Sequence, residues 1–142
     1  MILLVEDNDD DRDLALLAFR QAKVPYELAA VADGEQALQA LLPQGGAGQG
    51  GNTIDLLLLD LKLPKIDGLE VLRRVRAHPR TRFLPVVILT SSLERSDVVE
   101  CYRNGANSYL RKPVDFTDFV ELAAAVGSYW EKYNQAPPAY AG

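Results

Sequence analysis

Short apolar runs alternate with segments of helical periodicity, and this alternation is the feature that most restricts the fold. Two of the runs, Leu56–Leu59 and Val86–Leu89, contain only aliphatic side chains, so neither side of either run is suited to face water. Strands that are apolar on both faces are typical of parallel sheets covered by helices on each side. The alternation therefore predicts an α/β protein built on a doubly wound parallel sheet.

The predicted elements form five strand–helix units. We expect strands at 2–5, 27–31, 55–59, 86–90 and 107–110, and helices at 10–23, 34–42, 68–77, 95–104 and 115–133. Asp33 can cap the second helix, Gly68 begins the third, and Pro85 precedes the fourth strand. With 142 residues, the chain is long enough for one such domain.

Composition and charge exclude several classes of protein. Runs of Leu, Ile and Val do not exceed four residues, whereas a membrane span needs about 18 apolar residues, so no span is expected. The net charge of -5 disfavours nucleic-acid binding, and the arginines between Arg73 and Arg82 are expected to be a solvated helix end and loop. The single cysteine, Cys101, is expected to be a plain helix residue. It cannot form an internal disulfide, and the amino terminus lacks the basic segment of a signal peptide, so a cytoplasmic location is expected.

The segment 44–51 is rich in glycine and predicts a mobile loop. Gly46, Gly48 and Gly51 match the spacing of a dinucleotide-binding loop. That loop must follow a strand and begin a helix, whereas this segment follows a predicted helix and precedes a predicted strand. We therefore expect no nucleotide site here.

Polar side chains stand at the ends of four predicted strands. The first strand ends in Glu6 and Asp7, the third in Asp60 and the fourth in Thr90, and Lys112 follows the fifth. In a doubly wound sheet, ligands bind beyond the carboxyl ends of the strands, where these side chains meet. Each residue alone has an ordinary structural explanation, but their conjunction at one edge predicts a site.

The charges at this edge predict a divalent cation. Glu6, Asp7 and Asp60 carry three negative charges and Lys112 offsets one of them. A set of oxygen ligands favours Mg²⁺, which keeps several waters and binds through one or two carboxylates. The four aspartates between 9 and 13 are expected to be solvated and to favour the positive end of the first helix.

The same arrangement predicts phosphoryl chemistry. With a metal on one side and Lys112 on the other, the Asp60 carboxylate is suited to take a phosphoryl group as an acyl phosphate. The Thr90 hydroxyl can donate a hydrogen bond to a phosphoryl oxygen.

Four strings surround these residues: Val5-Glu6-Asp7-Asn8, Leu59-Asp60-Leu61-Lys62-Leu63-Pro64 with Asp67-Gly68, Leu89-Thr90-Ser91-Ser92, and Tyr109-Leu110-Arg111-Lys112-Pro113. In order and spacing, they resemble the receiver domains of two-component response regulators over about residues 2–127. The resemblance implies a flavodoxin-like sheet of order 2-1-3-4-5 with helices on both faces. It assigns 1–127 to the receiver domain and 128–142 to an extension of the last helix and a flexible tail, with no output domain.

The resemblance implies roles for the site residues. Asp60 is phosphorylated by a sensor histidine kinase, and Thr90 and Lys112 hold the phosphoryl group. Asp7 ligates Mg²⁺ directly, together with Asp60. Glu6 assists, where the family often has a second aspartate, and this substitution leaves the metal role intact.

Three further expectations follow from the resemblance. The backbone carbonyl of Lys62 adds a metal ligand, and the side chains of Lys62 and Ser92 modulate self-dephosphorylation. Thr90 and Tyr109 form a conformational switch. The bond between Lys112 and Pro113 is cis and aims the ammonium into the site.

The expected function is that of a single-domain response regulator. Such a protein is not an enzyme with turnover, although it phosphorylates itself from small donors and dephosphorylates itself. The strings Leu-Asp-Leu-Lys-Leu-Pro-Lys and Thr-Ser-Ser are also similar to the small regulators that partner phytochromes.

Three alternatives remain open. A phosphorelay intermediate passes its phosphoryl group to another protein. A haloacid-dehalogenase-type phosphatase needs a second aspartate two residues after the nucleophile, where this chain has Lys62. A degenerate receiver would act only as a binding module. The presence of all the residues needed for the chemistry argues against this alternative.

The last helix predicts a homodimer, because it carries two apolar stripes. The core stripe consists of Phe116, Phe119, Val120, Ala123 and Gly127. The second stripe, assigned to the dimer interface, consists of Leu122, Val126, Tyr129 and Tyr133. The interface would also include the fourth helix and fifth strand. In the alternative, Trp130 and the tyrosines fold over the domain's own end.

Overall fold

A computed structural model describes residues 1–42 and 54–137. The glycine-rich segment at 44–51 and the part of the predicted tail after residue 137 lie outside the described residues. The strands are β1 (Ile2–Val5), β2 (Leu28–Val31), β3 (Leu56–Leu59), β4 (Val86–Thr90) and β5 (Ser108–Arg111). The α-helices are α1 (Asp9–Gln21), α2 (Gly34–Leu41), α3 (Gly68–Ala77), α4 (Arg95–Arg103) and α5 (Phe116–Ser128), and a short π-helix (Tyr129–Tyr133) follows α5.

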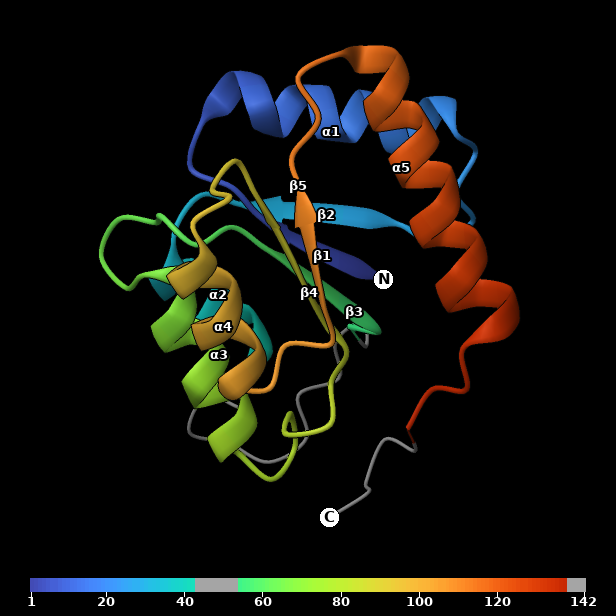
Figure 1. Ribbon diagram of the computed structural model, residues 1–142. Helices are drawn as coiled ribbons and strands as arrows, with labels where there is room; N and C mark the ends of the chain where they lie inside the picture. The colour runs from blue at the N-terminus through green and yellow to red at the C-terminus, as the bar shows by residue number, and fades with distance from the viewer. Residues whose placement is uncertain (43–53, 138–142) are drawn as a thin grey trace.

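The five strands form one parallel sheet in the order β2-β1-β3-β4-β5, so the predicted fold and strand order are confirmed. Figure 1 shows α1 and α5 on one side of the sheet and α2, α3 and α4 on the other. Within the described part of the chain, no helix is both long enough and apolar enough to span a bilayer.

Alternate residues of each central strand supply two separate cores. Leu3 and Val5 of β1 pack with buried residues of α2, α3 and α4, whereas Ile2 and Leu4 pack with buried residues of α1 and α5. Side chains of a strand point alternately to the two faces, so an all-apolar strand feeds both cores. Cys101 is the one buried residue that α4 contributes.

Gly68 brings α3 against the end of β3. A Cβ at this position would lie 2.1 Å from the carbonyl oxygen of Asp60, which no side chain tolerates. The Gly68 N–H donates to the carbonyl of Leu61 at 2.8 Å, and the Asp67 carboxylate caps the helix by accepting from the N–H of Glu70 at 2.9 Å. The pair Asp67-Gly68 therefore both begins α3 and fixes it beside Asp60.

The last helix buries most of the predicted core stripe, with differences at two positions. Val126 is 6% exposed and lies in the same core as Phe119 and Ala123, so its predicted place on an exposed stripe is wrong. These three residues follow i, i+4, i+7 spacing, which places them on one helix face. Leu122 is half-buried against this core, whereas Phe116, predicted for the core, is 37% exposed.

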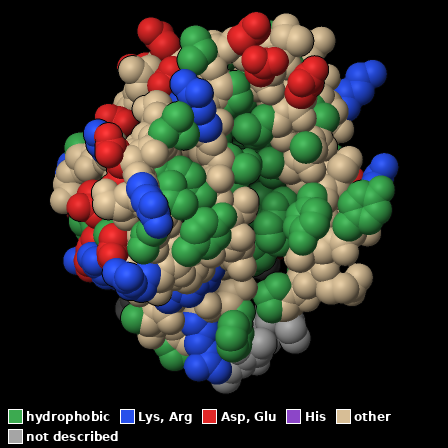
Figure 2. Space-filling view, viewed as in Figure 1, with side chains coloured by type: hydrophobic (Ala, Val, Ile, Leu, Met, Phe, Trp, Pro, Cys, Tyr) green, Lys and Arg blue, Asp and Glu red, His purple; other side chains and the backbone are tan. Residues whose placement is uncertain are grey.

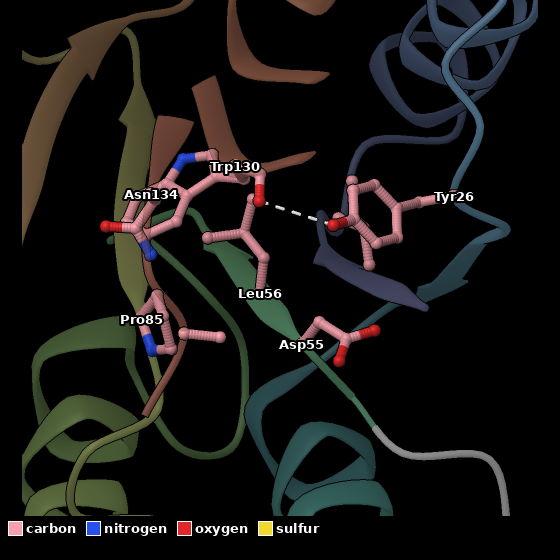
Figure 3. A pocket seen from close by; sticks show the side chains of 8 residues that line it. Tyr26, Asp55, Leu56, Pro85, Trp130 and Asn134 are labelled. Carbon is pink, nitrogen blue, oxygen red and sulfur yellow. Dashed lines mark hydrogen bonds between the residues drawn. The ribbon is translucent and has the colours of Figure 1, made fainter. Parts of the chain in front are cut away.

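The segment after α5 is attached to the domain by Trp130. The Trp130 side chain packs against the core between α1 and α5. The backbone carbonyl oxygen of Trp130 accepts a hydrogen bond from Tyr26 Oη at 3.3 Å (Figure 3). Trp130 thus folds over the domain's own end, as the alternative predicts. Tyr129 and Tyr133 remain 52% and 71% exposed.

A small pocket lies between Trp130 and the amino-terminal ends of β1 and β3. Leu56, Pro85 and Asn134 also line it, as Figure 3 shows. Its volume of about 40 Å³ holds about three water molecules, too few for a substrate or a cofactor. The pocket also lies at the opposite end of the strands from the polar residues that the sequence singles out.

Arg76, in the last turn of α3, is half-buried, so the prediction that the arginine cluster is solvated is wrong at this position. Its guanidinium donates to the carbonyl oxygen of Gly105 at 2.8 and 3.0 Å, to that of Leu84 at 2.6 Å and to Asn107 Oδ1 at 2.9 Å. These acceptors precede β4 and β5. Arg76 therefore ties α3 to the starts of two strands.

We predict that Arg76→Ala lowers the free energy of unfolding by about 3 kcal/mol, because it leaves several partly buried backbone carbonyls without their donor. Urea unfolding followed by circular dichroism measures the change. The matched control is Arg74→Ala, whose guanidinium pairs with Glu70 on the helix surface and whose loss should cost about 0.5 kcal/mol or less. Equal destabilisation by the two substitutions would contradict the role of Arg76.

Candidate functional site

Polar side chains from the ends of four strands meet at the carboxyl edge of the sheet, as the sequence predicts. The parallel ladder continues past the strands, since the N–H of Asp60 donates to the carbonyl of Val5 at 3.2 Å and that of Lys112 to the carbonyl of Thr90 at 2.7 Å. Glu6, Asp60 and Thr90 are only 3%, 7% and 2% exposed. The backbone of the sheet thus holds charged and hydroxyl groups in a largely dry position.

Three carboxylates form a compact group at this edge. Glu6, Asp7 and Asp60 each offer an oxygen within 4.8 Å of the other two, and Asp7 is the exposed member. Glu6 Oε2 also accepts from the N–H of Asn8 at 3.2 Å, and Asp60 Oδ1 accepts from the N–H of Leu61 at 2.7 Å. An all-oxygen group of this kind, open to solvent on one side, fits a hard divalent cation that keeps part of its water.

Lys112 lies among these carboxylates and is 10% exposed in its side chain. Its Nζ pairs closely with Glu6 and lies 3.2 Å from Asp60 Oδ2 and 3.3 Å from Asp11 Oδ2. Asp11 is 42% exposed in its side chain, and the prediction that the aspartates of the first helix are solvated omits this contact with the site. One ammonium links residues from three elements.

Burial and charge act in opposite directions on this group. Burial disfavours the charged form of Lys112, but the hydrogen bond with Glu6 and the charges of Asp60 and Glu6 outweigh it and raise the pKa of the ammonium above its usual range. Burial is the largest influence on Glu6 and raises the pKa of its carboxyl, although Lys112 and the N–H of Asn8 act to lower it. The ammonium thus stays charged, and it offsets part of the cost of burying Glu6.

The bond between Lys112 and Pro113 is trans, because the described residues contain no cis peptide bond. The cis prediction is therefore wrong. Lys112 follows β5 directly beside the end of β4, and its long stem carries the ammonium to Glu6 and Asp60 with a trans bond.

The predicted switch and modulating residues lie around the end of β4. Tyr109 Oη donates to the carbonyl oxygen of Ser92 at 2.9 Å, and the N–H of Ser92 donates to Thr90 Oγ1 over a long 3.4 Å. Lys62 is exposed, two residues beyond Asp60. The structure thus connects Thr90 and Tyr109 through one intervening residue.

Two contributors to the site escape the sequence analysis. Besides Asp11, Arg12 reaches back from α1, where its Nη1 donates to the carbonyl oxygen of Glu6 at 2.8 Å. Asn8 starts this turn by capping α1, since its side chain accepts from the N–H of Asp11 at 2.9 Å. A capping asparagine directly after Glu6 and Asp7 is the sequence signal that α1 begins next to the site, where residues of its first turn can reach back to it.

A cavity of about 240 Å³ lies beside the site, between α3 and α4. It is lined by Leu61, Lys62, Asp67, Leu69, Asp97, Glu100 and Cys101. Cys101 is 1% exposed, and burial, with the charges of Asp97 and Glu100, raises the pKa of its thiol to about 11. Such a thiol is protonated near neutral pH and is a poor nucleophile, which agrees with a plain helix residue.

Comparisons with known proteins identify relatives of the whole arrangement. A family model described as the response regulator receiver domain matches residues 2–124. A probable methanogenesis regulatory protein, FilR2 of Methanothrix harundinacea, is 39% identical over 96% of this chain and 87% of its own length. Response regulator Rcp1 of Synechocystis is 35% identical over 98% of this chain and 94% of its own length.

Solved structures share the fold and the sequence. The crystal structure of the Mn²⁺-bound form of response regulator Rcp1 has a TM-score of 0.81 and covers 96% of this chain and 97% of that one. The bacteriophytochrome response regulator RtBRR is 46% identical, with a TM-score of 0.74, over 98% of this chain and 84% of that one.

We predict that Lys112→Gln lowers the free energy of unfolding by about 3 kcal/mol at neutral pH, because it leaves buried carboxylates without their cation. The same change raises the pKa of Glu6 further. A folded-state pKa above the unfolded value means that the folded protein binds the proton more tightly, so the deficit relative to wild type should shrink as the pH falls toward about 5.

Urea unfolding at several pH values tests this prediction, and millimolar Mg²⁺ should also shrink the deficit. Lys62→Gln is the control, because it removes an exposed ammonium from the neighbourhood of the site. A deficit that is independent of pH would show that Lys112 does not compensate the buried carboxylates.

Proposed function

The chain belongs to the response regulator receiver domain family, and on this basis we propose that Asp60 accepts a phosphoryl group from a sensor histidine kinase. The observation that carries the assignment is Lys112 Nζ, 3.2 Å from Asp60 Oδ2 and in close contact with Glu6. An ammonium there offsets charge on the carboxylate as a phosphoryl group arrives. The protein acts as a phosphorylated signalling domain, without turnover of a substrate.

The reaction transfers a phosphoryl group between two side chains. An oxygen of the Asp60 carboxylate forms a bond to phosphorus while the bond to the histidine nitrogen of the kinase breaks. The electron pair stays on that nitrogen, which takes up a proton. Lys112 and the Thr90 hydroxyl then hold oxygens of the acyl phosphate.

A divalent cation, which we take to be Mg²⁺, would offset the remaining phosphoryl charge in this reaction. Glu6, Asp7 and Asp60 would hold it, together with the backbone carbonyl of Lys62. The support is the compact group of three carboxylate oxygens and the solvent exposure of Asp7.

We expect the protein to gain one phosphoryl group when it is incubated with acetyl phosphate and Mg²⁺. Intact-mass spectrometry detects the gain. Asp60→Asn should abolish it, because an amide is not a competent nucleophile, and a chelator should abolish it in the wild type.

The matched control is Asp67→Asn, which removes a carboxylate that caps α3 seven residues further along. This variant should still be phosphorylated. Labelling of Asp60→Asn at the wild-type level would overturn the assignment.

We further propose that Thr90 and Tyr109 couple phosphorylation to shape. A phosphoryl group on Asp60 draws the Thr90 hydroxyl inward and vacates space for the Tyr109 ring. In addition, Lys62 and Ser92, each two residues beyond a site residue, modulate self-dephosphorylation by obstructing or ordering the attacking water. The exposed Lys62 side chain supports access to that water.

The relatives point to the class of kinase. RtBRR, whose name includes bacteriophytochrome, favours a kinase of the phytochrome type in the cytoplasm, whereas FilR2 is named for methanogenesis. A relay role, in which Asp60 passes its phosphoryl group on, uses the same site. The receiver domain at 1–127 carries this function, and the π-helix at Tyr129–Tyr133 extends its last helix.

We also propose that a second copy of the chain docks on the face formed by α4, β5 and the end of α5. Figure 2 shows hydrophobic side chains gathered on this side of the molecule. Val99 and Tyr102 of α4 are 41% and 51% exposed, and Tyr129 and Tyr133 follow on the extended last helix. Two residues of the interface predicted from the sequence differ in exposure from Tyr129 and Tyr133. Leu122 is half-buried, and Val126 is buried in the core and is no longer part of the proposed interface.

Sedimentation tests this interface. We expect a homodimer at micromolar concentration and expect Tyr129→Glu with Tyr133→Glu to weaken it roughly a hundredfold, because buried aromatic side chains contribute strongly to interfaces. Leu17→Glu is the control, since it places a charge on an equally exposed apolar residue of α1. A monomeric wild type would remove the proposed dimer.

A further inference from the structure

Ser92 is joined to three different elements by its polar groups. Its N–H donates to Thr90 Oγ1 at 3.4 Å, and its carbonyl oxygen accepts from Tyr109 Oη at 2.9 Å. Its hydroxyl donates to Asp97 Oδ2, in the first turn of α4, at 2.6 Å. Ser92, two residues beyond the end of β4, thus links the proposed phosphoryl contact, a tyrosine of β5 and the start of α4.

The start of α4 depends on the same hydroxyl. Glu94 occupies the capping position but makes no side-chain capping hydrogen bond, and its N–H instead donates to Ser92 Oγ at 3.3 Å. Asp97, three residues further on, reaches back to the hydroxyl. The hydrogen bond to an ionised carboxylate is the shortest of these contacts and is of a kind stronger than a neutral one.

The proposed switch must break the contacts that Thr90 and Tyr109 make with Ser92. Thr90 Oγ1 gives up the Ser92 N–H if it turns to a phosphoryl group on Asp60, and Tyr109 gives up the Ser92 carbonyl if its ring moves inward. The hydrogen bond to Asp97 fixes Ser92 in the position from which it makes both of these contacts. The carboxylate of Asp97 therefore opposes the rearrangement although it does not touch Asp60.

We propose that Asp97 is a positioning residue that holds Ser92, and through it Thr90 and Tyr109, in the unphosphorylated arrangement. The inference rests on the proposed function of Asp60. Since a ligand shifts a two-state equilibrium by its differential affinity, loss of the Asp97 contact raises the population of the phosphoryl-binding arrangement and the apparent affinity of its ligand.

Titration calorimetry with beryllofluoride and Mg²⁺, a mimic of the acyl phosphate, measures that affinity. Ser92→Ala removes the hydrogen bond and should tighten binding roughly tenfold or more, the range for one hydrogen bond to a charged group, whereas Asp97→Asn leaves a neutral acceptor and should tighten it roughly three- to tenfold. The double variant should bind no tighter than Ser92→Ala alone, because both changes act on the same contact. Ser92→Thr keeps the hydroxyl and should bind as the wild type does.

Asp118→Asn is the matched control, because Asp118 occupies the equivalent turn of α5 and stabilises the helix end in the same way. It should leave the affinity unchanged. Weaker or unchanged binding by both Asp97→Asn and Ser92→Ala would overturn the inference and leave Asp97 with only a capping role. Lack of binding by the wild type, or equal binding by Asp60→Asn, would instead overturn the proposed function.

Discussion

The ion pair between Lys112 and the buried carboxylates is the interaction on which the site depends. Glu6 and Asp60 lie at the ends of two neighbouring strands, where their charges repel each other and burial penalises both. The ammonium from the end of β5 makes this arrangement tolerable, and Asp11 of α1 shares it. The requirement acts on the whole sheet, since a slip of one residue in any of these strands would turn a charge into the core.

The same constraint explains how the two proposed roles, cation binding and nucleophilic attack, can share one edge of the sheet. A cation site needs excess negative charge, whereas a nucleophilic carboxylate needs that charge reduced as a phosphoryl group approaches. In the proposed function, Asp7, which is exposed, would serve the first need, and Lys112, which is nearly buried, would serve the second. Asp60 would take part in both.

The fold could be predicted from the sequence because β1 and β3 are apolar throughout and β4 is apolar up to its last residue, and such runs have few places outside a doubly covered parallel sheet. The site could be predicted because strand ends in that fold converge. The contacts of Asp11 and Arg76 could not, since both depend on how a helix lies relative to distant backbone. Helical periodicity assigned Val126 to an exposed stripe, but the residue is buried. Periodicity gives the direction of each side chain but does not show how wide the buried face of the helix is.

The uneven anchoring of the helices bears on the free energy of local opening. α3 and α5 each bury four residues, whereas α4 buries Cys101 alone. Amide hydrogens in α4 should then exchange with solvent through opening events that leave the rest of the domain intact, at a free energy far below that of global unfolding. A small change in free energy is enough to shift or locally unfold a helix that is held in this way. A chemical event at the strand ends can therefore alter the surface of α4 without disturbing either core.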